Sequence, residues 1–367
     1  MPSINLINFL FPFSIAFILS VLFTYLIRRI ALYYKILDYP SLPRKIHKKS
    51  IPLLGGIGIF IAFTITLGYY TLLTDKILSS YILGKYLWGI LGGGLILIIG
   101  GILDDKFSLR PSQQFIFPIL ATLVIIVSGI GINYITNPLG GIIRLDTIKW
   151  KIFTLGNLPY HLTLFADLFT LVWLLGMIYT TKFLDGLDGL VSGIGVIGSV
   201  VLFFLSLRPE VMQPETAMLC IILAGSTAGF LIFNFHPAKI FLGEGGSTFI
   251  GFALGTLAII SGGKIATALL CMGIPILDMV WVVVRRLFTK KSPFLGDRKH
   301  LHFRLLDIGF SHKQAVLFLW FFSACFGFVA LFLESKGKLI TLILLAIIML
   351  VLASILVFIY NKRYKSG

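Results

Sequence analysis

Acidic residues that could hold a cation or a phosphate-bearing substrate occur in three short segments of the chain. Asp104 and Asp105 are adjacent, Asp185 and Asp188 are three residues apart in Asp-Gly-Leu-Asp-Gly, and Glu244 stands in Gly-Glu-Gly-Gly-Ser. Adjacent carboxylates repel each other, and Mg²⁺ with oxygen ligands relieves the repulsion while keeping phosphate ligands. A hydrated loop is the plainer interpretation of Asp104 and Asp105 alone. The second segment is more specific, because its glycines allow close approach of a ligand and its spacing predicts two acids on one helical face.

Basic residues and histidines that could recognise phosphate lie in two further segments. Lys45 and His47 precede a Gly-rich helix start near residue 55, where backbone N–H groups can donate to phosphate oxygens. The second group, in a large basic segment, comprises His300, His302 and Arg304. These histidines would suit a sugar pyrophosphate; a pH-sensitive or metal site is the alternative, although no third ligand at zinc-site spacing accompanies them. Basic loops are common, so neither group decides the function alone.

The composition predicts that membrane helices position these residues. Hydrophobic residues make up 57% of the 367-residue chain and charged residues 13%, about half the charged fraction of a soluble globular protein, roughly 25%. Apolar runs of about 20 residues predict transmembrane helices. Eleven such runs lie at about 5–27, 52–74, 85–103, 114–134, 166–183, 190–207, 216–233, 247–261, 265–287, 314–332 and 338–360. We therefore expect an all-α, polytopic membrane protein that forms one transmembrane domain over residues 1–367.

The distribution of basic residues predicts how the helices are oriented. With the N-terminus outside and the C-terminus in the cytosol, the interior segments and the tail hold 22 of the 31 Lys and Arg residues, as the positive-inside rule requires. The interior segments are 28–51, 104–113, 182–189, 234–246 and 285–313. The net charge of +16 is thereby explained without a nucleic acid partner. Outside the membrane, partial alternation of apolar and polar residues at about 140–156 predicts a small β-hairpin.

Taken together, the motifs resemble those of the polyprenyl-phosphate N-acetylhexosamine-1-phosphate transferase family (glycosyltransferase family 4), which is related to phospho-MurNAc-pentapeptide translocase. The similarity covers about residues 25–320 and includes separated motifs in the family's order. These are Asp38–Gly56, Gly101–Asp105, Asp185–Leu190, Asn234 with Pro237–Lys239, Pro275–Asp278 with Arg285 and Arg286, and His300–Leu306. The His300–Leu306 segment is more similar to the branch that initiates teichoic acid or O-antigen than to the peptidoglycan branch.

The chain departs from the family pattern at several motif positions. Lys182 stands where the family usually has Asn, Glu244 where it has Asp, and Phe303 where it has a last His. Gln114 and Pro118 replace a Lys and a Gln in the helix after the aspartate pair. Our hypothesis is that Lys182 supplies, from a neighbouring segment, the cation that position 114 has lost. An unrelated change at a helix cap is the alternative.

The resemblance implies a reaction and a set of site residues. The family transfers a sugar 1-phosphate from a UDP-sugar, here expected to be UDP-N-acetylglucosamine, to undecaprenyl or another polyprenyl phosphate, and UMP leaves. Asp185 and Glu244 would bind Mg²⁺, with Mn²⁺ as an alternative ion. Asp104, Asp105 and Asp185 would be catalytic, the first two at the acceptor phosphate. The residues that would contact the substrates, or organise the loops that do, are Lys45, His47, Lys182, Asp188, Asn234, His300, His302 and Arg304.

The resemblance also implies a location. The site would face the cytosol from the plasma membrane, in a multi-pass protein for which a homodimer would be an ordinary assembly. Two other functions fit the sequence. A degenerate family member would bind a lipid phosphate without turnover. A transporter would place charges near the bilayer midplane and break helices in paired halves; clustering of the acids at helix ends favours an enzyme at the membrane surface.

Overall fold

The computed structural model describes residues 6–40, 49–74, 76–78, 81–137, 140–155, 158–262, 265–290 and 300–365. Most of the chain is helical, because in an apolar surrounding a helix satisfies its own backbone hydrogen bonds. The helices are α1 (Ile7–Tyr33), α2 (Gly55–Leu72), α3 (Gly84–Phe107), α4 (Pro111–Gln114), α5 (Ile116–Ser128), α6 (Leu164–Leu184), α7 (Leu190–Leu207), α8 (Pro214–Asn234), α9 (Gly243–Ile260), α10 (Ile265–Cys271), α11 (Gly273–Phe288), α12 (Leu301–Asp307), α13 (His312–Phe332) and α14 (Ser335–Lys365).

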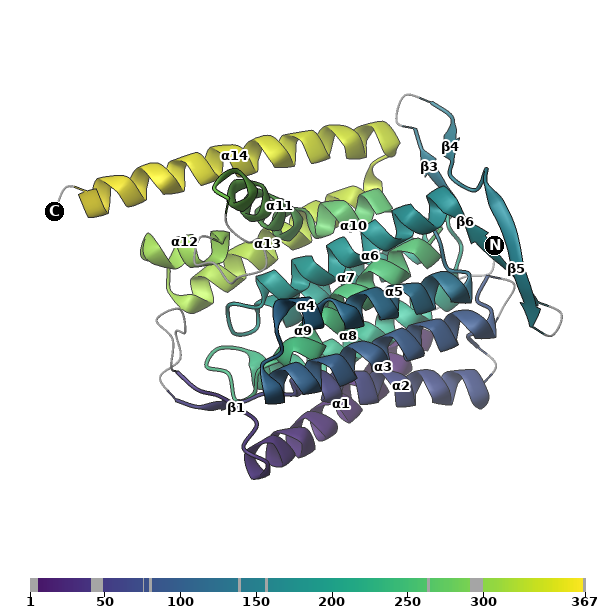
Figure 1. Ribbon diagram of the computed structural model, residues 1–367, viewed down its shortest axis with the longest axis horizontal. Coiled ribbons are helices and arrows are strands. Elements are labelled where there is room, and N and C mark those ends of the chain that lie inside the picture. The colour runs from purple at the N-terminus through teal and green to yellow at the C-terminus, as the bar shows by residue number, and fades with distance from the viewer. Residues whose placement is uncertain are drawn as a thin grey trace.

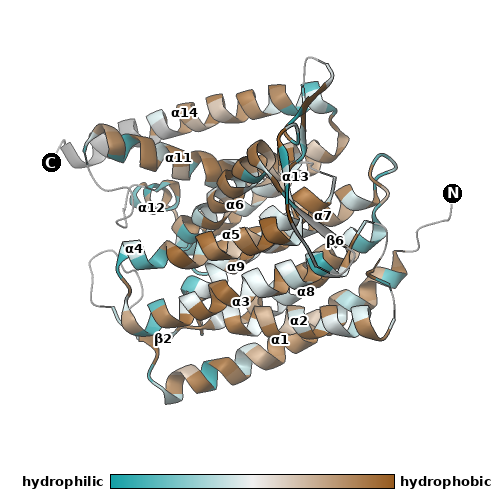
Figure 2. Cartoon of the chain, turned by 45° about the vertical axis from the view of Figure 1, so that its right-hand side comes forward, coloured by the Kyte–Doolittle hydropathy of each residue, from teal (hydrophilic) through white to brown (hydrophobic). Residues whose placement is uncertain are grey.

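These helices form an elongated bundle whose two ends differ (Figure 1). Within the described residues, ten helices are long and apolar enough to cross a membrane, counting α4 and α5 as one, and the bent pair α10–α11 makes an eleventh span. The expected polytopic helical protein with about eleven spans is therefore confirmed. Hydrophobic residues run along the helices, hydrophilic residues gather at α4 and α12, and the strands carry residues of both kinds (Figure 2).

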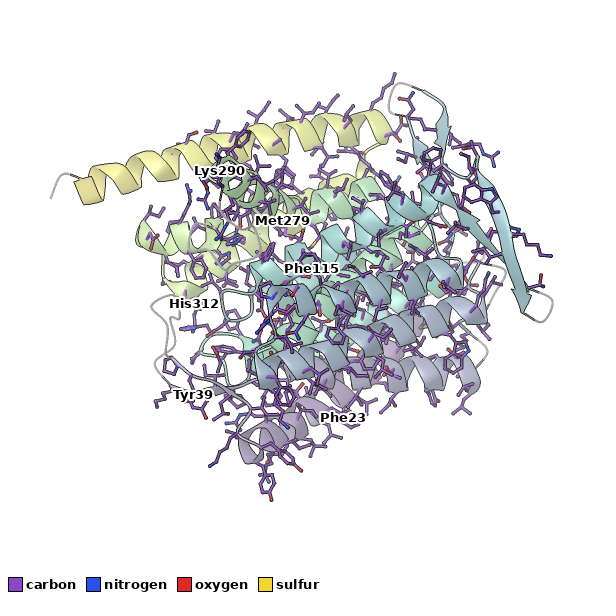
Figure 3. The ribbon with its side chains drawn as sticks, in the orientation of Figure 1. Phe23, Tyr39, Phe115, Met279, Lys290 and His312 are labelled. Atoms are coloured by element: carbon purple, nitrogen blue, oxygen red, sulfur yellow. The ribbon has the colours of Figure 1, made fainter. Side chains whose placement is uncertain are left out.

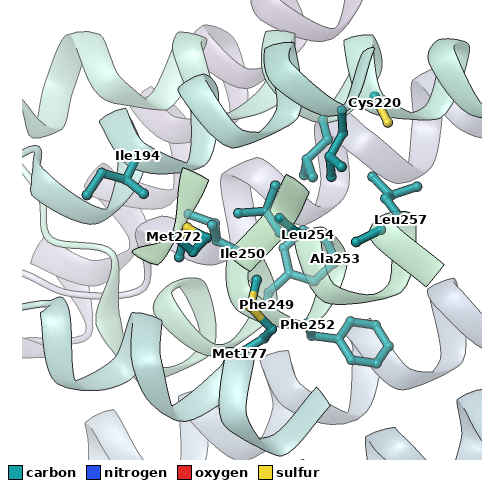
Figure 4. Packing of buried hydrophobic residues seen from close by; sticks show 14 of the residues in the cluster. Met177, Ile194, Cys220, Phe249, Ile250, Phe252, Ala253, Leu254, Leu257 and Met272 are labelled. Atoms are coloured by element: carbon teal, nitrogen blue, oxygen red, sulfur yellow. The ribbon is translucent and has the colours of Figure 1, made fainter. Parts of the chain in front are cut away.

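Helix α9 lies at the centre of the bundle. It packs against α2, α3, α6, α7, α8 and α10, and all of its 18 residues are buried except Glu244 and Ile260. Figure 4 shows apolar side chains of α9, including Phe249 and Leu254, in the buried cluster that also contains Met177 of α6 and Cys220 of α8. The carboxylate of Glu244 is therefore carried by the helix that the rest of the protein surrounds.

The predicted span 265–287 is a broken helix. Helices α10 and α11 meet at 79° across Met272. Pro275 has no N–H with which to bond the carbonyl of Cys271, so the helical ladder is interrupted there. The hydroxyl of Ser323, on α13, donates to that carbonyl at 2.6 Å and satisfies the group that the proline leaves free.

The strands that were predicted to lie outside the membrane pair differently from the prediction. Two hairpins are present, β3 (Tyr134–Thr136) with β4 (Ile142–Arg144) and β5 (Lys149–Leu155) with β6 (Leu158–Thr163). Strands are therefore present at about 140–156, as expected, but β4 and β5 pair with β3 and β6 and not with each other. The fourth span also ends earlier than expected, at Ser128, where Gly129 adopts φ +89°.

The opposite end of the bundle carries the acidic motifs, and we call it the motif end. There α3, α6 and α8 finish and α2, α7 and α9 begin, far from the hairpins (Figure 1). Two motif segments expected in loops lie partly in helices: Asp104 and Asp105 belong to the last turn of α3, and Glu244 to the first turn of α9. The expectation that Asp185 and Asp188 share a helical face was wrong, since both lie in a tight turn between α6 and α7.

Candidate active site

Glycines bring three helices into backbone contact at the motif end. A Cβ added to Gly101, near the end of α3, would overlap the backbone of Gly245 in α9. A Cβ on Gly56, at the start of α2, would overlap the backbone of Gly246. No larger residue fits at Gly101 or Gly56 without moving a helix, and this close approach sets the aspartate pair of α3 beside the first turn of α9.

Asp105 joins α3 to the beginning of α9. Its Oδ1 accepts a hydrogen bond from the backbone N–H of Glu244 at 3.1 Å, at a helix end where unpaired N–H groups favour an anion. Gly243 adopts φ +71°, and a Cβ there would collide with the Asp105 carboxylate. Asp105 thus fixes the position from which the Glu244 side chain extends.

Four polar side chains form a chain of contacts across the same region. Asp104 Oδ1 accepts from Gln114 Nε2 at 2.8 Å, and Gln114 Oε1 accepts from Lys182 Nζ at 2.8 Å. Lys182 Nζ also lies 2.5 Å from Glu244 Oε1, and these two side chains are only 14% and 18% exposed. The structure thereby brings Lys182 to position 114, as the hypothesis of a displaced cation expects. Nitrogen and oxygen atoms gather between the labelled Phe115 and His312 in Figure 3.

Asp185 adds a further carboxylate to this cluster. It directly follows α6, and its side chain keeps solvent-accessible surface at the motif end. Protein atoms nevertheless crowd the group, and this desolvation raises the pKa of the Asp185 carboxyl, with the charges of Glu244 and Asp188 acting in the same direction. A bound cation would reverse such a shift, so the cluster fits a cation in addition to Lys182.

The second acid of the turn faces another group. Asp188 Oδ2 lies 2.7 Å from His236 Nδ1 and accepts from the backbone N–H of Ala238 at 3.1 Å. The ring of His312 stacks on that of His236, with centroids 4.1 Å apart. Ligand atoms of all three side chains lie within 4.8 Å of one another. Because the two rings stack, their in-plane nitrogen lone pairs point in parallel directions and not toward one shared ion. The geometry therefore favours direct contact of Asp188 with the histidine pair, which we call the acid–histidine clasp, over a shared metal.

His236 and His312 were absent from the predicted site. Each stands alone in sequence, and no spacing links it to Asp188. One signal was available: five of the six histidines fall in the segments predicted to be interior, and the sixth, His161, falls in an exterior one.

Asn234 ties this turn to the segment before α9. Its Oδ1 accepts from the backbone N–H of Gly189 at 3.1 Å and from the Ser192 hydroxyl at 2.8 Å, and its Nδ2 donates to the carbonyl of Ile240 at 3.1 Å. The side chain is buried, at 3% exposure. Asn234 was predicted either to contact the substrates or to organise the loops, and these contacts support the second role.

Replacing Asn234 by Ala should destabilise the protein by about 2–3 kcal/mol, because buried partners on Gly189, Ser192 and Ile240 lose their hydrogen bonds. The measurement is thermal unfolding of the detergent-solubilised protein. Asn133→Ala, at an exposed asparagine, is the matched control. Equal melting temperatures for the two variants would contradict this role.

The predicted histidines close over the other side of the turn. His300 Nδ1 lies 2.8 Å from Asp278 Oδ2, whose other oxygen accepts from the backbone N–H of Leu301 at 2.8 Å. The His302 ring stacks on that of His300 and lies against Gly186, where a Cβ would collide with it. Desolvation, followed by the nearby His300, lowers the pKa of His302 to about 3, so this imidazole is neutral near neutral pH.

Comparisons with known proteins agree with this geometry. The model of glycosyl transferase family 4 matches residues 87–262. A decaprenyl-phosphate N-acetylglucosaminephosphotransferase of Mycolicibacterium smegmatis is 30% identical, over 90% of this chain and 84% of the relative. The chain belongs to glycosyl transferase family 4.

The similarity to two further relatives extends over most of the chain. A probable undecaprenyl-phosphate N-acetylglucosaminyl 1-phosphate transferase of Bacillus subtilis is 28% identical, over 98% of this chain and 95% of the relative. An undecaprenyl-phosphate alpha-N-acetylglucosaminyl 1-phosphate transferase of Escherichia coli K12 is 30% identical, over 87% and 82%. The similarity therefore includes the segments on both sides of residues 87–262.

Some of the residues predicted from the family motifs lie apart from the carboxylate cluster. Arg304 is in α12, one turn after His300. Lys45 and His47 lie outside the described residues. The strands that flank their segment, β1 (Leu37–Asp38) and β2 (Ile51–Pro52), pair with each other at the motif end.

Proposed function

We propose that the chain transfers N-acetylglucosamine 1-phosphate from UDP-N-acetylglucosamine to undecaprenyl phosphate, or another polyprenyl phosphate, in the first membrane step of cell-envelope glycan synthesis. The observation that carries the proposal is the convergence of carboxylates from α3, from the turn after α6 and from α9 at one end of a membrane bundle. A water-soluble donor and a lipid acceptor can meet at such an end. The names of the three relatives support this sugar and this class of acceptor.

In the proposed reaction, a phosphate oxygen of the acceptor attacks the phosphorus that carries the sugar. A new P–O bond forms while the bond to UMP breaks, and UMP leaves with the electron pair. A phosphate monoester with a second pKa of about 6 is largely dianionic at neutral pH, so a general base is not required. Catalysis then consists of positioning and charge neutralisation.

The carboxylates and Lys182 divide these tasks. Asp104 and Asp105 each use Oδ1 in a hydrogen bond, while Oδ2 makes no hydrogen bond to a described residue, and we assign these oxygens to the acceptor phosphate region. Lys182, held by Gln114, supplies positive charge for the donor pyrophosphate. His300 and His302 lie beside the turn that would receive the sugar or its pyrophosphate, and we assign Arg304, one turn after His300 on α12, to the same substrate groups.

Asp185 and Glu244 are the residues that would hold a divalent cation, Mg²⁺ or Mn²⁺. Both carry oxygen ligands of the kind that hard cations prefer, and the charge of Glu244 helps to raise the pKa of Asp185, which places the two carboxylates close together. When bound, the ion would supply charge that offsets the repulsion between two anionic reactants.

The proposed location is the cytosolic face of the plasma membrane. The segments at the motif end hold most of the Lys and Arg residues, and the positive-inside rule assigns such segments to the cytosol. UDP-sugars would then reach the site directly. Cysteine labelling at the exposed Lys106 position of α3 tests this: a membrane-impermeant reagent should label Lys106→Cys only after cells are opened.

The activity is tested by incubating purified protein with undecaprenyl phosphate, Mg²⁺ and a panel of UDP-sugars while following UMP release. Release that needs UDP-N-acetylglucosamine, the lipid and Mg²⁺ supports the proposal. Lipid binding without release by folded protein would instead identify a degenerate family member. A transporter is disfavoured because, among described residues, one bent helix pair is present, whereas paired halves would contain two.

A further inference from the structure

The contact between Lys182 and Glu244 has a consequence for cation binding. We propose that the Lys182 ammonium and a divalent cation compete for the Glu244 carboxylate, so that Lys182 is a built-in counter-ion that leaves Glu244 when the cation binds. The inference takes one element from the proposed function, namely that Glu244 binds a divalent cation. The place of the Lys182 ammonium then depends on whether the cation is present.

The geometry shows that the carboxylate is already engaged. Lys182 Nζ lies 2.5 Å from Glu244 Oε1, which is a full ion-pair contact between two largely buried side chains. An ammonium at this distance points an N–H at the oxygen lone pair that a metal ion would need. A divalent cation bound to the same oxygen would also stand a few ångströms from another positive charge, and that repulsion is strong away from bulk water.

The surroundings provide a second position for the ammonium. Gln114 Oε1 accepts from Lys182 Nζ at 2.8 Å, and the ring of Tyr179, one turn earlier on α6, has its centroid 5.6 Å from the same nitrogen. A rotation of the long Lys182 side chain can therefore release Glu244 while the ammonium keeps the amide oxygen and an aromatic face as partners. The freed charge would remain beside the proposed pyrophosphate position.

The competition depends on the length of the Glu244 side chain. Glu244 reaches Lys182 from the first turn of α9, whose backbone is fixed by Asp105 and by glycine contacts to α2 and α3. An aspartate there would be one methylene shorter and would withdraw its carboxylate from Lys182. The shorter side chain would keep its negative charge for a cation. Glu244→Asp therefore breaks the ion pair with Lys182 and leaves both charges in place.

The experiment measures Mn²⁺ binding by electron paramagnetic resonance to the full-length, detergent-solubilised protein without donor or acceptor. Lys182→Met should tighten Mn²⁺ binding by about ten-fold or more, the scale on which one adjacent charge changes the affinity of a carboxylate. Glu244→Asp should also tighten it, and provides the test if Lys182→Met does not fold. Glu244→Gln should abolish the site. Lys106→Met removes an exposed cation from the end of α3 and should change affinity by less than about two-fold, because exposed charges are screened.

A purely stabilising ion pair predicts a different result. Lys182→Met would then lower the melting temperature and leave Mn²⁺ affinity unchanged or weaker. Affinities of Lys182→Met and Glu244→Asp within about two-fold of the parent protein, or no Mn²⁺ binding in any variant, would overturn the inference. The binding measurement contains no substrate, so it is independent of UMP release. Normal UMP release by the parent protein together with unchanged Mn²⁺ affinities in the variants would refute the competition alone. Absent UMP release by the parent protein together with tighter Mn²⁺ binding in both variants would refute the transferase proposal alone.

Discussion

Asp185→Asn is expected to lower the rate of UMP release by about 10²–10³-fold, the scale of losing one preorganised electrostatic group at a reacting phosphate. The substitution keeps the size of the side chain and removes its charge. Asp185 is the most exposed carboxylate of the cluster, and desolvation, followed by the charges of Glu244 and Asp188, raises its pKa. Loss of this charge should weaken cation binding and leave the fold intact, since Asn can occupy the same space.

The rate is measured at saturating donor and lipid, with the melting temperature as a check on folding. Asp167→Asn is the matched control, because Asp167 lies on the same helix, α6, at the opposite end, where its Oδ2 accepts from the backbone N–H of Thr163. The control should keep most of the activity. If both variants were equally active, Asp185 would have no part in the reaction.

Gly101→Ala is expected to destabilise the protein by about 1–3 kcal/mol, the usual cost of overpacking, and to reduce activity as well. The added methyl group would overlap the backbone of Gly245 and push α3 away from α9. Asp105 would then lose its contact with the N–H of Glu244, and the aspartate pair would move relative to the other carboxylates. A single methyl group should therefore disturb stability and catalysis together.

Gly92→Ala provides the comparison within α3. A Cβ at Gly92 would meet only Val124 Cγ1, at an ordinary 3.5 Å, and Ala favours a helix over Gly by about 1 kcal/mol. This variant should be as stable as the parent protein or slightly more stable, with normal activity. Thermal unfolding and UMP release measured on both variants test the idea, which fails if Gly101→Ala behaves like Gly92→Ala.

The number of spans was predictable because lipid imposes a simple length rule on apolar segments. The break between α10 and α11 was not, although Pro275 was visible, because a proline within an apolar run can leave a span continuous, kink it or break it, and the surrounding helices decide which. The strand pairing was wrong for a related reason. Alternation predicts strands such as β4 and β5, but pairing depends on turns and register.

Part of the candidate site followed from comparing motif positions. The exchange of charge between positions 114 and 182 predicted that the two residues meet, and the structure places Gln114 Oε1 against Lys182 Nζ. The clasp of His236 and His312 on Asp188 could not be predicted, because it joins residues from three segments that only the folded bundle brings together. Likewise, no pattern in the sequence distinguishes Asn234 as a substrate contact from Asn234 as a link between loops.

The burial of α9 bears on how the protein is made. Of the ten unbroken spans among the described residues, α9 is the least apolar, and five of its six neighbours, α2, α3, α6, α7 and α8, are synthesised before it. A ribosome would thus deliver the Glu244 helix to the membrane after most of its binding surface has been inserted. This helix would be received by protein rather than by lipid, and catalytic competence would be acquired late in biogenesis, when α9 enters the space left between earlier helices.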